Sequence, residues 1–469
     1  MTVSQKIKEF SAKAEMLAFP HFAEISRTEE ECTGKVLEAF VKNKVSEACF
    51  GGTSGYGYGD FGRDTLDRVY ADVFRTQDAL VRHNFVSGTH AISTAFYGVL
   101  RPGDTLVSVT GTPYDTLQKV IKGFKEWGIE YREVPLKPWG IEYREVPLKP
   151  WDIEDREVPL KEWSIEDREV PLKPWSIEDR EVPLKEWGIE DREVPLNGTG
   201  ETDGMPDLNA VSAAASGAKA VFIQRSRGYT FRKSFTTEEI GEMIAAAKHG
   251  NPDVICIVDN CYGEFTQNTE PTDFGADLCI GSLIKNPGGG IASTGGYIAG
   301  KAELVGLCAD RLSYSGAGKD LGCSLGQNKE MFLGLFLAPQ AAANALKTSA
   351  FASELFTSLG YECLPRNSEK RADIITVIKL GSPEKVAVFC KGLQAGSPVD
   401  SFVCPQAWDM PGYDGKVIMA AGGFNMGASI ELSADAPMRQ PYAVWLQGGL
   451  TYPAGKIGII SAAQALETA

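Results

Sequence analysis

Short apolar runs alternate with amphipathic segments along much of the chain. Strand-like, mainly apolar runs occur at residues 79–86, 105–110, 220–226, 254–260, 276–282 and 295–300. Residues 113–121 and 236–250 have helical spacing instead, and Thr236 followed by acidic residues is a helix start signal. Strands that are apolar throughout and separated by helices are typical of a parallel sheet covered on both faces. The pattern therefore predicts an α/β fold with a mainly parallel sheet.

The pattern changes near residue 326, where a long helical stretch begins and later apolar segments such as 373–380 and 428–435 predict further strands. We therefore expect a large domain over residues 61–325 and a smaller C-terminal α/β domain over residues 326–469. The first 60 residues have the spacing of helices that lead into a glycine-rich segment.

One 12-residue unit occurs six times between residues 127 and 197. Each copy contains a tryptophan, the text IE(Y/D)REVPL and a proline, so it could form only a short strand of about five residues. The repeat could be a β-meander that binds a partner, or a tandem expansion of one ordinary strand and turn. The copies are nearly identical and lack clean alternation of apolar and polar positions, which favours the expansion.

Composition and charge narrow the range of functions. The chain has 469 residues and a formal net charge of −15, which argues against a broad nucleic-acid or anionic-membrane surface. No apolar run reaches the ~18 residues of a membrane span, and the N-terminus lacks a signal-peptide core, so we expect a cytoplasmic protein. The ten cysteines form no CxxC pair and the four histidines lack metal-ligand spacing, so we expect no metal site.

Several polar residues follow directly on the predicted strands. Lys285 lies in the stretch SLIKNPGGG, and Asp259 ends the strand before it. Gly88 opens a predicted helix after residues 79–86, and Tyr114 begins the helix after residues 105–110. Because ligands of open α/β sheets bind outside the carboxyl ends of the strands, these side chains are candidates for one site.

Each of these residues also has an ordinary explanation: a plain helix cap for Gly88, a turn for Asp259, core packing for Tyr114 and a surface position for Lys285. Together, however, a phosphate-binding helix start, an aromatic cover, an acid and a lysine in this order describe a pyridoxal-phosphate site. A lysine in a partly dry site is expected to have a lowered pKa and to bind the cofactor covalently. The glycines after Lys285 would let the chain bend away from it.

The motifs that hold these residues are long and specific. They include GYGYGDFGRDTLDRVYADVF at 55–74, DALVRHNFVSGTHAI at 78–92, VDNCYGEF at 258–265, GSLIKNPGGGIASTGGYIAGK at 281–301 and ELSADAPMRQPY at 431–442. The chain resembles the methionine γ-lyase and cystathionine β-lyase-like "aluminium resistance" proteins, which are fold-type-I pyridoxal-phosphate enzymes. The resemblance covers nearly the whole chain outside the repeat, and a single IEYREVPL is what such a protein would show.

The resemblance implies a role for each candidate residue. Lys285 would bind the cofactor covalently, Asp259 would contact its pyridine nitrogen, and Tyr114 would stack on its ring. The phosphate would be bound by Gly88, Thr89 and Ser282.

The resemblance also implies a homotetramer built from dimers, with an active site shared between subunits. Tyr58 and Arg63, together with Tyr56, are the candidates to reach a neighbour's phosphate, although their spacing departs from the Tyr-x-Arg motif of the better-studied lyases. Arg439 would hold the substrate carboxylate.

The implied activity is a carbon–sulfur lyase reaction: elimination at the β or γ carbon of an amino acid such as methionine or cystathionine, after Lys285 removes the α-proton. Two other interpretations stay open. One is a different pyridoxal-phosphate reaction, such as aldol cleavage or transamination. The other is a non-catalytic scaffold that uses the repeat, against which the presence of Lys285, Asp259 and Arg439 argues.

Overall fold

A seven-stranded sheet organises the larger part of the computed structural model, which describes residues 3–136, 204–366, 368–410, 413 and 415–469. The strand order is β1-β7-β6-β5-β4-β2-β3. The strands are β1 Asp78–Arg82, β2 Thr105–Ser108, β3 Glu130–Glu133, β4 Ala220–Gln224, β5 Ile255–Asp259, β6 Leu278–Ser282 and β7 Gly296–Gly300. Only β7 is antiparallel to its neighbours, so the prediction of a mainly parallel sheet is confirmed.

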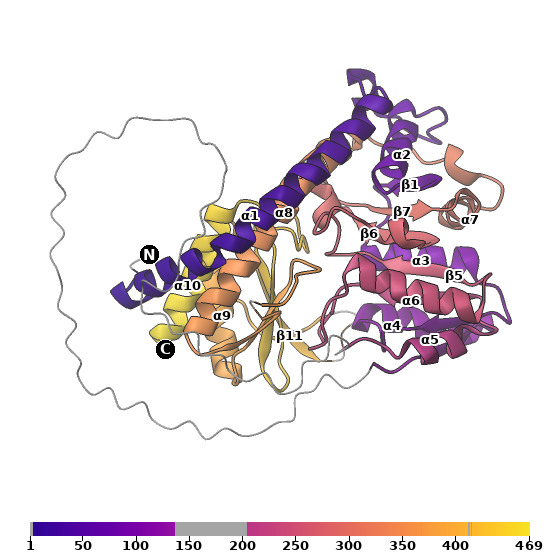
Figure 1. Ribbon diagram of the computed structural model, residues 1–469. Helices are drawn as coiled ribbons and strands as arrows, with labels where there is room; N and C mark the ends of the chain where they lie inside the picture. The colour runs from indigo at the N-terminus through magenta and orange to yellow at the C-terminus, as the bar shows by residue number, and fades with distance from the viewer. Residues whose placement is uncertain (1–2, 137–203, 367, 411–412, 414) are drawn as a thin grey trace, which may run out of the picture. The chain divides into compact units, whose positions relative to one another are not determined.

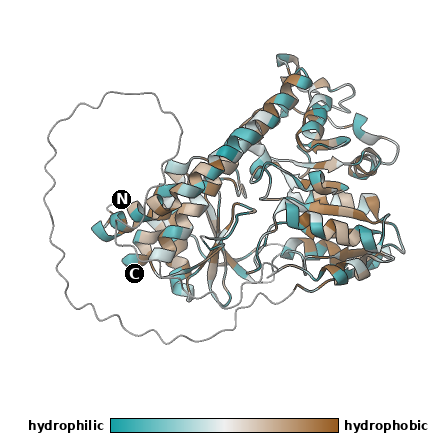
Figure 2. Cartoon of the chain, viewed as in Figure 1, coloured by the Kyte–Doolittle hydropathy of each residue, from teal (hydrophilic) through white to brown (hydrophobic). Residues whose placement is uncertain are grey.

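Both faces of this sheet are covered, as its continuous apolar strands predict. On β5, Ile257 packs with one core, whereas Cys256 and Val258 pack with another. Side chains from α3 Gly88–Val99, α4 Asp115–Lys122 and α7 Ala302–Leu312 join the first core, and those from α5 Leu208–Ala215 and α6 Thr237–Gly250 join the second. The strands are accordingly brown in Figure 2, between helices that carry teal polar residues.

Two long helices, α1 Gln5–Lys42 and α8 Asn328–Ser358, lie side by side (Figure 1). Near its start α1 buries Ile7 in the core of the second sheet, and near its end it buries Val36 in a core shared with β1 and β7. Helix α1 and the short 3₁₀-helix η1 Glu47–Phe50 lie within the first 60 residues. The domain boundaries expected near residues 60 and 325 stay predictions.

The second sheet has six antiparallel strands in the order β10-β11-β12-β13-β9-β8. They are β8 Glu362–Leu364, β9 Thr376–Lys379, β10 Trp408–Asp409, β11 Lys416–Ala421, β12 Ser433–Pro437 and β13 Ala443–Gln447. Helices α9 Pro383–Ala395 and α10 Tyr452–Glu467 pack against one another and contribute to its core. Strand β12 starts later than the segment 428–435 predicts, because the Glu431 carboxylate accepts backbone N–H groups of Phe424 and Asn425 and holds a loop there.

Only the first copy of the 12-residue repeat lies within the described residues, where it contributes the edge strand β3. The other copies, and with them the expected tandem expansion, lie outside the described residues. All ten cysteines are free thiols, and eight of them are buried. Within the described ranges, no helix combines the length and the apolar character needed to cross a bilayer.

Candidate active site

Lys285 lies in the loop that follows β6, at the start of the short 3₁₀-helix η5 Asn286–Gly288. Its Nζ stands 3.9 Å from the centroid of the Tyr262 ring. Asn286 ties this loop to the turn after β5, because its Nδ2 donates to the carbonyl groups of Tyr262 and Glu264 at 3.1 and 2.9 Å. The lysine is therefore held over an aromatic ring by its own flanking residue.

The glycines after Lys285 permit close backbone packing. A Cβ on Gly288 would lie 1.6 Å from the carbonyl oxygen of Leu283. Gly289 has a left-handed φ of 57°, and a Cβ there would lie 2.4 Å from the carbonyl oxygen of Gly334 on α8. Only glycine fits such positions. The loop therefore folds tightly on itself and against α8, with the Lys285 side chain directed toward Tyr262.

Asp259 is the last residue of β5 and is 4% exposed. Its Oδ1 accepts the backbone N–H of Cys261 at 3.1 Å. Burial raises the pKa of Asp259, and the charge of Lys285 acts in the opposite direction. The position at the carboxyl end of a central strand, facing a lysine, is the one predicted from the sequence.

A phosphate-sized group has a suitable cradle beside these residues. Helix α3 begins at Gly88, and a Cβ on this glycine would lie 3.2 Å from Cys261 Sγ and 3.3 Å from Ser282 Cβ. The Ser282 hydroxyl is buried and has no hydrogen-bond partner. An unpartnered hydroxyl next to a helix N-terminus, whose first N–H groups point outward, fits a phosphate.

Tyr114 is linked to this cradle. Its hydroxyl lies 3.0 Å from Thr89 Oγ1, and its backbone N–H donates to Gln224 Oε1 at 3.0 Å. Burial raises the pKa of Tyr114 well above its ordinary value, and the charge on Asp259 adds to this effect. Tyr114 is therefore a neutral phenol at neutral pH, placed between the first turn of α3 and the end of β4.

The expected lowering of the Lys285 pKa is wrong. Burial alone would lower it, but the acidic groups that face the amine, among them Cys261, Tyr262 and Asp259, hold its pKa well above the ordinary value. An opposite charge such as that of the Asp259 carboxylate can outweigh dehydration when it lies close to the amine. The free side chain of Lys285 is therefore an ammonium group, and its proton must leave before the amine can act as a nucleophile.

Two residues of the site, Cys261 and Tyr262, were not singled out in the sequence. Tyr262 adopts a left-handed φ of 72°, which is costly for a residue with a large side chain. Its hydroxyl accepts a hydrogen bond from Ser429 Oγ at 3.3 Å, in the segment before β12. The sequence offers no signal for this conformation, which depends on a contact between segments far apart in the chain.

The structure does not bring Arg63 to Lys285 within this chain. Arg63 is 2% exposed, and its guanidinium donates to the carbonyl groups of Gly57 and Gly322 at 2.9 and 2.8 Å. Tyr56 and Tyr58 are instead exposed on the surface, and their rings stack with centroids 5.6 Å apart. The roles expected for the three residues toward a neighbour's phosphate stay predictions.

Arg439 lies on the surface of the chain. It is exposed in the turn after β12, and its guanidinium makes no hydrogen bond or ion pair with any described residue. The expected contact between Arg439 and a substrate carboxylate therefore stays a prediction.

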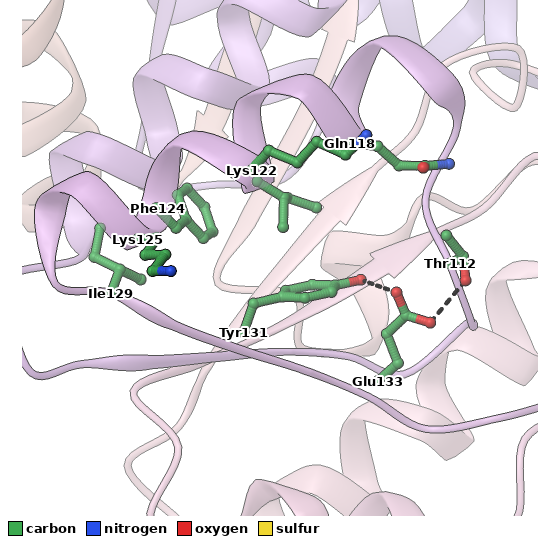
Figure 3. Close-up of a pocket in the computed structure, with 9 residues that line it drawn as sticks. Thr112, Gln118, Lys122, Phe124, Lys125, Ile129, Tyr131 and Glu133 are labelled. Atoms are coloured by element: carbon green, nitrogen blue, oxygen red, sulfur yellow. Dashed lines mark hydrogen bonds between the residues drawn. The ribbon is translucent and has the colours of Figure 1, made fainter. Parts of the chain in front are cut away.

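Two surface cavities lie elsewhere in the described part of the chain. One of about 390 Å³ lies between α4 and β3, where Tyr131 and Thr112 both donate to Glu133 at 2.8 and 2.7 Å (Figure 3). Another of about 470 Å³ lies where Lys248 and Lys301 both pair with Asp277. None of the predicted site residues lines either cavity, so the chemistry is located by the side chains around Lys285.

Comparison with known proteins gives a consistent result. The family model described as "Methionine gamma-lyase" matches residues 7–167 and 176–467. An uncharacterized protein of Bacillus subtilis, YnbB, is 40% identical over 452 residues, which are 94% of this chain and 92% of YnbB. The solved structure of a carbon-sulfur lyase involved in aluminum resistance from Clostridium novyi superimposes with a TM-score of 0.82 at 40% identity, covering 98% of this chain and 96% of that chain.

A more distant structure defines the fold. The pyridoxal-5'-phosphate dependent protein YhfS of Escherichia coli superimposes with a TM-score of 0.56 at 14% identity, over 95% of this chain and 97% of that chain. The fold is therefore that of the fold-type-I pyridoxal-phosphate enzymes, as the resemblance implies. The family match and the fold together imply pyridoxal phosphate as the cofactor, and the unpartnered Ser282 hydroxyl beside the start of α3 fits its phosphate.

Proposed function

Because the chain belongs to the methionine gamma-lyase family, we propose that it is a pyridoxal-phosphate-dependent carbon–sulfur lyase that acts on sulfur-containing amino acids. The observation that carries this proposal is the position of Lys285 Nζ, 3.9 Å above the Tyr262 ring. Asp259 and Tyr114 flank the amine, and the unpartnered Ser282 hydroxyl lies at the adjoining cradle.

The bound cofactor would supply an electron sink for the charge that remains on a substrate carbon after its proton is removed. Lys285 would hold the cofactor and then, as a free amine, take the α-proton of the substrate at Nζ. Asp259 would accept a hydrogen bond from the pyridine nitrogen and keep it protonated. Gly88, Thr89 and Ser282 would bind the phosphate.

Tyr114 is suited to act as the proton donor when the sulfur group leaves. Its raised pKa keeps the proton on the phenol, so Tyr114 can donate that proton to a leaving thiolate. We propose methionine or cystathionine as the type of substrate, with elimination at the γ or β carbon.

Turnover of a small panel of amino acids tests the proposal. Purified protein loaded with pyridoxal phosphate should release ammonia, a keto acid and a thiol from a sulfur-containing amino acid. Aldol cleavage would release an aldehyde instead, and transamination would transfer the amino group to a keto acid without free ammonia. If the loaded protein releases no thiol from any member of the panel, the lyase proposal is wrong.

We further propose a homo-oligomer, a dimer of dimers, in which each site is completed by a neighbour. Tyr58 and Phe61 are 67% and 53% exposed, on the same glycine-rich stretch that holds Arg63 inside its own subunit. A second copy of the chain could cover these rings. The exposed Tyr58 is therefore a better candidate than Arg63 to reach across.

Complementation tests the shared site. Lys285→Ala and Tyr58→Ala proteins should each have low activity, and dissociated and remixed pairs should regain part of it, because some hybrids contain one intact site. Native mass spectrometry should confirm that hybrids form. Hybrids without regained activity would show that Tyr58 does not serve a neighbouring site.

A further inference from the structure

A buried acid of the second sheet has one oxygen without a partner. Asp435 lies in β12 and is 9% exposed. Its Oδ2 accepts hydrogen bonds from the Tyr229 hydroxyl at 2.9 Å and from Gln447 Nε2 at 3.1 Å. Among the described residues, no lysine or arginine pairs with Asp435, and none donates a hydrogen bond to its Oδ1. A buried carboxylate normally has such partners, so the free oxygen calls for an explanation.

Asp435 lies on the face of the second sheet opposite to the one that its helices cover. The alternate residues Ala434 and Ala436 belong to the core shared with α9 and α10. Asp435 is the register partner of Trp445 on β13, so these two side chains share the other face. Trp445 Nε1 donates to the carbonyl group of Thr230 at 3.4 Å. The acid therefore lies where the second sheet meets the segment after β4.

Aromatic rings lie beside this carboxylate. The Tyr229 ring is 5.7 Å from the Tyr413 ring and 5.6 Å from the Trp445 ring, measured between centroids. Tyr229 and Tyr413 are partly exposed, so the cluster borders solvent. The face of an aromatic ring attracts a cation, and a carboxylate accepts strong hydrogen bonds from one. A carboxylate with a free oxygen beside such rings is therefore suited to an ammonium group.

The cluster adjoins the candidate active site. A Cβ on Gly228, the residue before Tyr229, would lie 3.5 Å from Tyr114 Cβ. Burial raises the pKa of Tyr262, the ring that faces the reactive lysine, and the charge of Asp435 adds to that effect. A group bound at Asp435 would therefore lie next to the reacting centre.

The reactive lysine is not the missing partner of this acid. Lys285 forms no ion pair with Asp435. Burial lowers the pKa of Lys285, and the largest opposing effects come from Tyr114 and from residues at the end of β5 and in the turn after it. Burial raises the pKa of Asp435, whereas its two hydrogen bonds and the charge of Lys285 act in the opposite direction. A cation at Oδ1 would favour the ionised carboxylate further.

We propose that Asp435 is a specificity-determining residue whose free oxygen, beside the Tyr229 and Tyr413 rings, binds a second ammonium group of the substrate. This inference rests on the proposed function, because it takes a sulfur-containing amino acid as the ligand. The α-amino group would be engaged at the Lys285 site, so the second ammonium group has to lie further along the side chain. A thioether with an amino group beyond its sulfur, such as cystathionine, is therefore favoured over methionine, whose methyl group would leave the buried carboxylate unpaired.

Binding of amino acids without sulfur tests the assignment in the absence of turnover. L-Homolysine has its second ammonium group as many bonds from the α-carbon as cystathionine does, and L-2-aminooctanoate has a methyl group at that position. L-Lysine and L-2-aminoheptanoate form a second pair that is one bond shorter. None of the four has a leaving group at the β or γ carbon. The absorbance change of the cofactor-loaded protein measures each dissociation constant.

Three variants are compared with the wild type. Asp435→Asn keeps the shape and an acceptor for Tyr229 but removes the charge. Tyr229→Phe keeps the ring and removes the hydroxyl that holds the carboxylate. The matched control is Asp409→Asn, because Asp409 is an exposed acid of the same sheet.

The wild type should bind L-homolysine about 10-fold or more tightly than L-2-aminooctanoate, as expected for a hydrogen bond to a buried charged group. Asp435→Asn should lose this preference, with affinity for L-2-aminooctanoate within about 2-fold of the wild type. Tyr229→Phe should reduce the preference in part, and Asp409→Asn should keep it in full. In the lyase assay, Asp435→Asn should lower kcat/KM for cystathionine relative to methionine.

Two results would overturn the assignment: a wild type without preference for the ammonium member of either pair, or a preference that persists in Asp435→Asn. An equal loss for both members of a pair would overturn it as well, because Asp435 would then only join β12 to the segment after β4. If Asp435→Asn fails to fold, judged by melting and cofactor loading, an unchanged preference in Tyr229→Phe overturns the assignment. A protein that releases no thiol but prefers L-homolysine through Asp435 would refute the proposed function and support this subsite, whereas a lyase without that preference would do the reverse.

Discussion

The segments around Lys285 and Arg63 both place one cation in a glycine-rich stretch, and the structure surrounds the two cations differently. Lys285 Nζ faces the Tyr262 ring at 3.9 Å, with acidic side chains around it. The Arg63 guanidinium is enclosed by the carbonyl groups of Gly57 and Gly322 and pairs with Asp64 at 2.8 Å. In both segments the glycines allow the backbone to pack closely. The groups that contact the cation differ, because side chains surround the Lys285 amine and backbone carbonyl groups surround the Arg63 guanidinium.

The acids of the two regions show the same contrast. Asp60, beside Arg63, accepts hydrogen bonds from Thr53, Ser324 and Asn328, and these overcome burial and lower its pKa to about 2. Glu264, near Lys285, has one oxygen without a partner, and burial raises its pKa to about 8. Unsatisfied buried groups are rare in proteins and call for an explanation. In the Arg63 region hydrogen bonds satisfy the buried carboxylate, although Asn328 Oδ1 beside it has no partner, whereas in the Lys285 region the carboxyl group itself and the Ser282 hydroxyl lack partners.

The largest expected effect is that of Lys285→Ala. Removing the amine eliminates both the covalent attachment and the base, so kcat/KM should fall by roughly 10³-fold or more. In the wild type, borohydride should fix the cofactor on the protein, and peptide mapping should find it at Lys285. Labelling of another lysine would contradict the site.

Arg63→Met should act on stability instead. The change removes charge-assisted hydrogen bonds to the buried carbonyl group of Gly57 and the partly buried one of Gly322, so the free energy of unfolding should fall by about 2–4 kcal/mol. Urea unfolding measures this change, and the protein that remains folded should keep cofactor affinity. If the variant has wild-type stability but no longer binds cofactor, Arg63 belongs to a binding site, and the two regions do not differ as described.

A matched glycine pair sharpens the comparison further. Gly289 and Gly59 both have a left-handed φ, 57° and 68°, so alanine costs a similar ~1–2 kcal/mol at each from the backbone alone. A Cβ at Gly289 would also lie 2.4 Å from the Gly334 carbonyl oxygen, whereas a Cβ at Gly59 meets nothing within 4 Å. Gly289→Ala should therefore lower the free energy of unfolding by about 1–3 kcal/mol more than Gly59→Ala. Equal losses would mean that the Lys285 loop can shift away from α8.

The last prediction is a pair of opposite pH dependences. The pKa of Asp60 is lowered from 3.8 to about 2 by folding, so its stabilisation is present above pH 3.8 and is lost as the pH falls toward 2. The pKa of Glu264 is raised from 4.5 to about 8, so the folded state holds a proton that the unfolded state releases, and stability falls as the pH rises between these values.

Unfolding free energies measured across this pH range for Asp60→Asn and Glu264→Gln test both signs. In Asp60→Asn the free energy of unfolding should fall less steeply at acidic pH than in the wild type. In Glu264→Gln it should fall less steeply as the pH rises toward 8. An unchanged slope in Glu264→Gln would show that Glu264 is already ionised in the folded protein.

Several parts of the site could be predicted from the sequence, because they depend on local order. The apolar runs identify the strands, and parallel strands end at one edge of a sheet. Asp259, Ser282 and Lys285, which follow adjacent strands, therefore had to lie close together once the alternation of strands and helices was recognised. The start of α3 at Gly88 could likewise be predicted, because Ser87 is a typical helix-capping residue and a strand-like run precedes it.

Tertiary structure alone decided what surrounds these residues, because those contacts join segments far apart in the chain. The pKa of Lys285 is raised because Cys261, Tyr262 and Asp259 converge on it, a balance between burial and charge that spacing does not reveal. Arg439, which was singled out in the sequence, is exposed in a turn, whereas Arg227, which was not, is buried after β4 and donates to Ser234. Burial and the identity of a charge's neighbours are properties of the packed chain, so the spacing of residues in the sequence does not reveal them.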